Sequence, residues 1–178
     1  RVGLDDPAYD PFNLAVGAED PMGTTTLVDD TIASWSGRGT TARPVDVVAP
    51  GTHVISLRVP GSFIDVNYGS TALVGTNYFR GTGTSQAAAV VAGLAALVYQ
   101  KYPSATPDQV KKLILNTSTA LTSSSALATP TAAGKGLPNA GRAVTTALPS
   151  TTSSKQAWTA GTGTGLLENT RGGSHVIT

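Results

Sequence analysis

The stretch that decides the fold reads GTGTSQAAAVVAGLAALV from Gly81 to Val98. Its glycines lead into small and apolar residues typical of a buried helix, which we expect to span Ser85 to Tyr102, with Pro103 ending it. A serine at this junction lies at the positive end of the helix dipole, near backbone N–H groups without intrahelical acceptors. That environment suits a nucleophile whose attack places negative charge on an oxygen. The alternative is an N-cap, a serine whose hydroxyl only accepts a hydrogen bond from the helix backbone.

The same stretch resembles the nucleophile motif of subtilisin-like serine proteases, in which G-T-S-x-A and then V-A-G open a buried helix. The positions that match the motif are Gly83, Thr84, Ser85, Ala87, Ala92 and Gly93. Gln86 stands where the family usually has Met, and Ala89-Val90 stands where it usually has Pro-His. Both departures lie on the helix behind the hydroxyl, so we expect altered packing and unchanged chemistry. The resemblance implies that Ser85 is the acyl-forming nucleophile.

Composition limits the possible classes of protein. The 178 residues suit one domain of roughly 150 residues, and a hydrophobic content of 40% supports a real core. Charged residues make up 13% and the net charge is +1, so we expect neither nucleic acid nor a membrane as a partner. The absence of cysteine excludes a disulfide scaffold, a zinc finger and a thiol nucleophile. No apolar run reaches the ~20 residues that a membrane helix needs.

Three further stretches upstream of Ser85 resemble the same family. Leu14 to Ala18 predicts a short buried strand like the family's A-V-G-A strand, and the loop before it implies a cis bond at Asp6-Pro7. Ala33 to Gly39 resembles a strand followed by an aromatic, a serine and a glycine. Pro44 to Gly51 resembles P-D-x-x-A-P-G with one inserted valine, and predicts a buried strand stopped by a Pro-Gly turn.

The segment between that turn and Ser85 has a weaker pattern. Val54 to Leu57 predicts another strand. Phe63 to Val66 and Asn77 to Arg80 flank a glycine-rich bend, so we expect an irregular hairpin that leads to Ser85.

Beyond the central helix, the sequence predicts two more helices. Thr106 to Gln109 is a capping box, and the apolar spacing after it predicts an amphipathic helix to about Ser118. Gly134 to Val144 resembles the family's closing motif, with Asn139 as an N-cap.

The last part of the chain differs from the rest in composition. We expect residues 1–148 to form the C-terminal part of a peptidase domain, and residues 149–178 to form a linker and tail. Gly161 to Gly165 lacks the Lys-Ser/Thr of a phosphate-binding loop, so we interpret it as a flexible segment. Gly163 to Val176 resembles a segment found beyond the protease domain in secreted actinobacterial subtilases.

Several parts of the family's catalytic machinery have no counterpart in this sequence. The Asp of D-T-G and the His of H-G-T-H-V-A-G are absent, and the oxyanion-hole Asn would fall just upstream of Arg1. His53 lies in a G-T-H-V stretch, but no His-Gly precedes it and it belongs to the Pro-Gly turn; we therefore expect a turn or surface histidine. His175, in the tail, is a similarly weak base candidate.

The sequence therefore predicts an α/β protein: the C-terminal portion of a subtilisin-like three-layer fold with a mostly parallel sheet. We expect the C-terminal chain of a nicked or autoprocessed, secreted serine endopeptidase that cleaves polypeptides. An N-terminal fragment of the same precursor would supply the Asp, the His and the oxyanion Asn. A serine without its base is a poor nucleophile, so the chain alone should be a poor protease. The chemistry needs no cofactor; structural calcium is possible, but Asp29 and Asp30 are too few and too isolated to assign as ligands.

Two alternatives remain open at this point. The first is a non-catalytic scaffold, a pseudoprotease whose upstream catalytic residues have decayed; the residues at the missing His and Asp motifs would decide. The second is a self-contained serine hydrolase that uses Lys101 or Lys135 as its base. Lys101 lies 16 residues along the predicted helix from Ser85, roughly 24 Å at ~1.5 Å per residue, which disfavours it.

Overall fold

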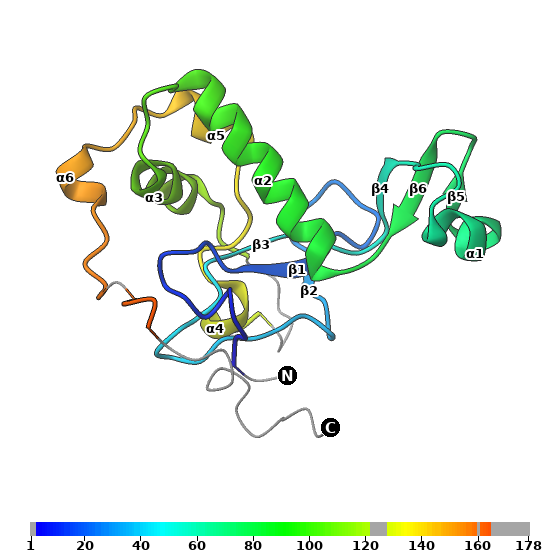
Figure 1. Ribbon diagram of the computed structural model, residues 1–178, viewed down its shortest axis with the longest axis horizontal. Helices are drawn as coiled ribbons and strands as arrows, with labels where there is room; N and C mark the ends of the chain where they lie inside the picture. The colour runs from blue at the N-terminus through cyan, green and yellow to red at the C-terminus, as the bar shows by residue number, and fades with distance from the viewer. Residues whose placement is uncertain (1–2, 122–127, 160, 165–178) are drawn as a thin grey trace.

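The computed structural model describes residues 3–121, 128–159 and 161–164. Figure 1 shows the arrangement of its elements. In chain order they are β1 (Val16–Asp20), β2 (Thr31–Ile32), β3 (Val47–Pro50), β4 (Val54–Leu57), α1 (Phe63–Ala72), β5 (Leu73–Val74), β6 (Tyr78–Gly81), α2 (Thr84–Lys101), α3 (Pro107–Thr117), α4 (Pro130–Ala133), α5 (Ala140–Thr145) and α6 (Thr151–Ser154).

A small sheet in the order β2-β1-β3 lies at the centre of the molecule. β1 pairs with β3 in parallel, with Val16 opposite Val47, and with β2 in an antiparallel register. Helix α2 lies on one face of the sheet and α4 lies on the other (Figure 1). This arrangement confirms the predicted α/β fold of three layers, and β3 is buried on both of its faces. In the described residues β1 and β3 form the parallel pair, whereas β1–β2, β4–β6 and β5–β6 are antiparallel, so the sheets described here are not mostly parallel.

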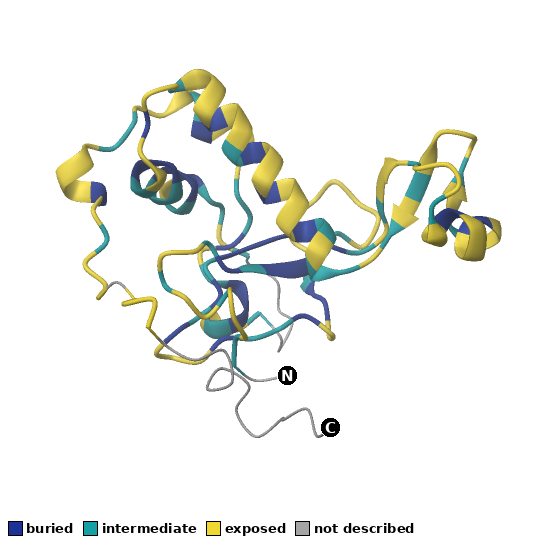
Figure 2. Ribbon diagram, viewed as in Figure 1, coloured by how far each residue is buried: buried dark blue, intermediate teal, exposed yellow. Residues whose placement is uncertain are grey.

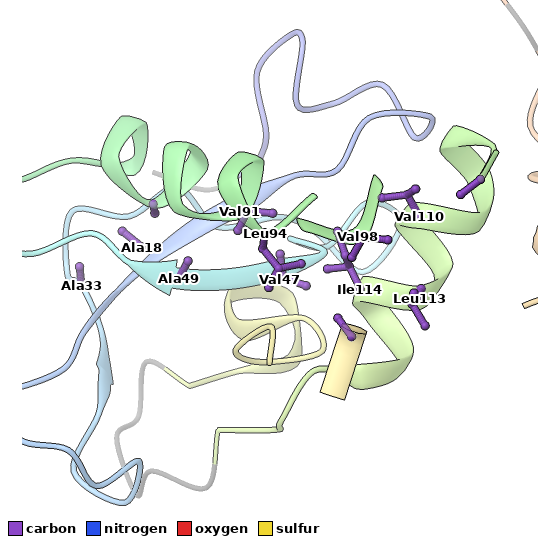
Figure 3. Close-up of a cluster of buried hydrophobic side chains, with 13 residues drawn as sticks. Ala18, Ala33, Val47, Ala49, Val91, Leu94, Val98, Val110, Leu113 and Ile114 are labelled. Atoms are coloured by element: carbon purple, nitrogen blue, oxygen red, sulfur yellow. The ribbon is translucent and has the colours of Figure 1, made fainter. Parts of the chain in front are cut away.

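The main core fills the space between the sheet and helices α2, α3 and α5 (Figure 3). From α2 it takes one stripe of side chains, four or three residues apart: Ala87, Val91, Leu94 and Val98. Successive residues of β3 alternate between the two faces, so Val47 and Ala49 join this core while Val48 joins a smaller cluster with Ala132 and Ala133 of α4. The remaining sides of α2 are largely exposed (Figure 2).

A second sheet, in the order β4-β6-β5, projects from this body together with α1 (Figure 1). Val54 to Leu57 forms the predicted strand and pairs antiparallel with β6. The predicted hairpin between Phe63 to Val66 and Asn77 to Arg80 is wrong, because Phe63–Ala72 is a helix. The Ser62 hydroxyl caps it by accepting a hydrogen bond from the Asp65 N–H, a local signal that outweighs the strand-like apolar residues.

Local signals in the second half of the chain predicted its structure well. The capping box at Thr106 and Gln109 is complete, and the Asn139 side chain caps α5.

In the loop before β1, the Asp6-Pro7 bond is cis, as the resemblance implied.

The segment from Pro149 to Ser154, interpreted as a linker, instead carries the helical turn α6. It packs on α3: Gln109 Nε2 donates to the Pro149 carbonyl, and Lys112 Nζ donates to the Ser153 carbonyl. Long-range hydrogen bonds of this kind leave no trace in local composition. The division of the chain after Leu148 stays a prediction, and most of the segment from Gly163 to Val176, including His175, lies outside the described residues.

Candidate active site

Ser85 is the second residue of α2 and is exposed to solvent. Gly83 is the N-cap and has no side chain to bond the helix, so the N-cap interpretation of Ser85 is wrong. In the part of the chain that the structure describes, the Ser85 hydroxyl forms no hydrogen bond. It is therefore open to a substrate and to a base.

The first N–H groups of α2 point out of the helix without a partner. Gln86 and Ala87 donate to the Gly83 carbonyl, whereas the N–H groups of Thr84 and Ser85 have no acceptor among the described residues. Free N–H groups at the positive end of an 18-residue helix favour negative charge on a nearby oxygen. The arrangement can thus stabilise an oxyanion formed next to the Ser85 hydroxyl.

The approach to Ser85 is tied to the central sheet. The Gly83 N–H donates to the Gly51 carbonyl at 2.8 Å, and the Gly51 N–H donates to the Glu19 carbonyl of β1 at 3.0 Å. A Cβ on Gly51 would lie 2.5 Å from the Ala18 Cβ and 3.0 Å from the Gly83 oxygen, so glycine is required at this crossing. The turn after β3 therefore positions the backbone that carries Ser85.

Gln86 covers the other side of this approach. A Cβ on Gly81 would lie 2.8 Å from its Nε2, and a Cβ on Gly83 would lie 2.7 Å from its Oε1. The carboxamide thus packs directly against two glycines that precede Ser85. That this packing differs from the packing around the family's usual Met stays a prediction.

Of the candidate bases named from the sequence, His53, Lys101 and Lys135 lie in the described residues, and none of the three forms a hydrogen bond with Ser85. His53 lies in the turn between β3 and β4, where its N–H donates to the Thr82 hydroxyl at 3.0 Å. In the described residues its imidazole forms no hydrogen bond with the Ser85 hydroxyl, in agreement with a turn histidine. Lys101 is the last residue of α2, at its opposite end. Lys135 is exposed in the turn after α4, where its N–H donates to the Asp46 carbonyl.

Sequence reasoning missed Arg43, which organises the loop before β1. Its guanidinium contacts six acceptors at 2.9 to 3.2 Å: the carbonyls of Ala8, Tyr9, Asp10, Asn13 and Pro44, and the carboxylate of Asp46. Lys111 of α3 also binds this loop, through the Pro11 and Asn13 carbonyls. Burial lowers the pKa of the Lys111 ammonium, and the nearby Asp46 carboxylate opposes that shift. No sequence signal marks Arg43, because most of its partners lie some 30 residues away.

Glu19 is a second buried charge that the sequence reasoning passed over. Its side chain is completely buried in β1, and neither carboxylate oxygen has a hydrogen-bond partner in the described structure. Burial, and then the charges of Asp30 and Asp20, raise its pKa to about 7. Burial also raises the pKa of Asp30, as do the neighbouring Asp29 and Asp20. The one signal that could have pointed to it is a glutamate placed directly after the apolar run from Leu14 to Ala18.

Two structural findings concern metals and membranes. Within residues 3–121, 128–159 and 161–164, no three His, Asp or Glu side chains are grouped so that they could bind a metal ion. Calcium binding stays a prediction without assigned ligands. No helix in these residues has the length and apolar character to cross a bilayer.

The sequence profile of the Subtilase family matches residues 3–163. The serine protease AprX of Bacillus subtilis is 45% identical over 106 residues, which cover 58% of this chain and 24% of AprX. An extracellular protease of Xanthomonas campestris is 38% identical over 117 residues, which cover 65% of this chain and 18% of that protein. The crystal structure of fervidolysin from Fervidobacterium pennivorans, a keratinolytic enzyme related to subtilisin, superposes with a TM-score of 0.62 at 30% identity. That superposition covers 81% of this chain and 20% of fervidolysin.

Proposed function

The chain belongs to the subtilase family, and from this premise we propose that it is the C-terminal part of a secreted serine endopeptidase whose nucleophile is Ser85. The observation that carries the proposal is the placement of Ser85: exposed, in the first turn of α2, beside N–H groups that have no acceptor in the described residues. The chain spans only about a quarter of AprX and a fifth of the Xanthomonas enzyme. The rest of the catalytic machinery would come from the part of the protein that this chain does not contain.

The proposed reaction uses this chain for attack and for charge stabilisation. The Ser85 Oγ attacks the carbonyl carbon of the scissile peptide bond, while its proton passes to a histidine of the N-terminal part. The carbonyl oxygen becomes an oxyanion next to the Ser85 N–H. The carbon–nitrogen bond then breaks, the amine leaves with that proton, and the acyl group stays on Ser85 until water hydrolyses the ester.

The exposed sides of α2 support an N-terminal partner. Only one stripe of the helix is buried, whereas Val90 and Leu97 are 42% and 47% exposed and Gly93 has open space beside it. A helix that is apolar nearly all round is typical of the interior of a larger domain. We propose that the N-terminal part of the same precursor covers these sides and brings the His, Asp and Asn to Ser85. Secretion is inferred from the relative that is named an extracellular protease.

A fluorophosphonate probe tests the nucleophile. In the full natural protein we expect the probe to label this chain at Ser85 only, and Ser85→Ala to abolish both the labelling and peptide hydrolysis. The thermal melt should change little, because Ser85 caps nothing and its hydroxyl has no partner in the described residues. Ser56→Ala, at an exposed serine of β4, is the matched control and should keep full activity.

Two results would count against the proposal. Full hydrolysis by Ser85→Ala would refute the nucleophile. A natural Ser85 that resists the probe, although the N-terminal part carries intact His and Asp motifs, would favour the non-catalytic scaffold.

A further inference from the structure

Four acidic side chains lie where β1 pairs with β2 and in the loop between these strands, and we call them the acidic corner: Glu19, Asp20, Asp29 and Asp30. Two of the four have left the solvent, since Glu19 is 0% exposed and Asp30 is 2% exposed. A charged carboxylate is costly to bury unless a cation or hydrogen bonds compensate its charge. The buried pair therefore needs a source of compensation other than water.

Strand pairing places Glu19 and Asp30 on the same face of the sheet. Glu19 lies opposite Ile32 in the antiparallel pair, and Asp30 comes two residues before Ile32. Side chains two residues apart on an extended chain point to the same face, and diagonal neighbours on adjacent strands lie within reach of each other. Burial and then the Asp30 charge raise the pKa of Glu19, in agreement with this placement. The two carboxylates thus lie close together, on the face where Ile32 packs against α4.

No basic group of the described residues neutralises this pair. Neither oxygen of the Glu19 carboxylate has a hydrogen-bond partner, and no ion pair involves Glu19 or Asp30 within residues 3–121, 128–159 and 161–164. Burial raises the pKa of both carboxyls, and the nearby charges that add to these shifts all belong to acidic residues. Both Glu19 oxygens are already enclosed by this chain, so a side chain from another part of the protein reaches them only if the sheet opens.

We propose that Glu19 and Asp30 bind a calcium ion inside the acidic corner. The donor set consists of carboxylate oxygens, which hard cations prefer. A bare Ca²⁺ ion lies only ~2.3–2.6 Å from its ligand oxygens, so folding can enclose it beside them. Ca²⁺ takes about six to eight oxygen ligands in a flexible geometry, so backbone carbonyls complete a site that has fewer than three acidic side chains. Mg²⁺ keeps several of its waters, which an enclosed position does not accommodate.

The ion stabilises the strand that supports the approach to Ser85. The Glu19 carbonyl accepts a hydrogen bond from the Gly51 N–H, and the Gly51 carbonyl accepts one from the Gly83 N–H. The side chain that binds the ion and the carbonyl that holds the turn thus belong to the same residue. Without the ion, the pair is stable only while Glu19 carries a proton. The inference does not rest on the proposed function, because the ion binds without any reaction at Ser85.

The first test counts the bound ions in the full natural protein. Glu19→Gln and Asp30→Asn each remove one charge and nearly keep the shape of the side chain. Equilibrium dialysis with radioactive calcium should find one ion fewer per molecule in each variant, whatever number other parts of the protein bind. The control is Asp29→Asn, at an exposed member of the acidic corner, which should keep the natural number.

Thermal melts at pH 8 provide the second test, because the order of two melting temperatures should reverse. In EDTA, Glu19→Gln should melt several degrees above the natural protein, since burial raises the pKa of Glu19 to about 7 and its charge at pH 8 is uncompensated. In millimolar calcium the natural protein should melt above Glu19→Gln, because only the natural protein binds the ion tightly. A side chain with a merely structural role would keep one order in both buffers.

Three results would overturn the inference. The first is an equal number of calcium ions in the natural protein and in both variants. The second is Glu19→Gln melting above the natural protein in both buffers, the result expected if Glu19 and Asp30 share a proton. The third is a reversal that potassium chloride produces and calcium does not, which would assign the pair to a monovalent ion.

Discussion

The fold raises the pKa of Glu19, and the effect of that shift on stability can be worked out. Its pKa rises from about 4.5 to about 7 on folding, because the charged form is buried without a partner in the described residues. A carboxyl whose pKa is raised in the folded state favours folding only while it is protonated. The contribution of Glu19 to the free energy of unfolding is therefore fully present below pH ~4.5. It is lost as the pH rises through 7, by about 3 kcal/mol in total.

Glu19→Gln should remove this pH dependence, since the amide is neutral throughout. We expect the free energy of unfolding of the natural protein to fall between pH 4.5 and pH 8, and that of the variant to stay nearly level over the same range. Urea unfolding at a series of pH values measures both slopes. Asp29→Asn, at an exposed neighbour that does not act on Glu19, should keep the natural slope. Equal slopes for the natural protein and Glu19→Gln would contradict the assignment.

At the scale of elements, two loops depend on contacts between distant segments. The turn after β3 supports the start of α2 through the Gly51–Gly83 hydrogen bond. The loop before β1 has little structure of its own and is held by Arg43 and Lys111. In both places, unpaired backbone groups of one segment find partners that another segment supplies.

Gly51→Ala should displace the approach to Ser85. The added Cβ would lie 2.5 Å from the Ala18 Cβ, so β1 and the turn must separate, at a cost of about 1–3 kcal/mol. We expect a lower melting temperature and slower fluorophosphonate labelling of Ser85. Gly37→Ala is the control, because no atom lies within 4 Å of its added Cβ and its φ is not positive. Labelling at the natural rate in Gly51→Ala would show that this crossing does not position Ser85.

Arg43→Met should unfold the loop before β1 first. Methionine matches the apolar stem but removes the guanidinium donors from five carbonyls and from the Asp46 carboxylate, which predicts a loss of about 3–5 kcal/mol. Arg43→Lys keeps the charge but offers fewer donors, so its free energy of unfolding should lie between those of the natural protein and Arg43→Met. Denaturant melts measure the loss, and Arg142→Met, at an exposed arginine, should cost little. A loss below ~1 kcal/mol for Arg43→Met would mean that the guanidinium contacts are not needed for stability.

At the scale of the whole molecule, the three layers are complete around β3 and incomplete around α2. β3 is covered by α2 on one face and by α4 on the other, whereas α2 has only one face buried (Figure 2). The described residues thus bury only one side of α2. An uncovered apolar helix in water favours association.

This chain should therefore be found bound to the N-terminal part of its own precursor. We expect two bands on a denaturing gel of the native protein, which co-elute on size exclusion, and we expect Leu97→Asp to weaken their association because it places a charge on the exposed side of α2. A well-folded monomer of 18.0 kDa with nothing attached would contradict this prediction. The control is Val28→Asp, at an exposed residue outside α2, which should leave the association unchanged.

The sequence by itself determined the elements whose signals are local. The glycines and small residues from Gly81 onward predicted the start of α2 at Ser85, and the capping box at Thr106 and Gln109 predicted α3, because in each case the deciding interactions lie within a few residues. Only the tertiary structure decided the partners of Arg43, the burial of Glu19 and the helical turn α6, since each depends on segments far apart in the chain. Helix α1 differs from these cases, because the Ser62 cap and the Arg58–Asp65 ion pair are local but were outweighed in the sequence analysis by an apolar pattern that indicated a strand.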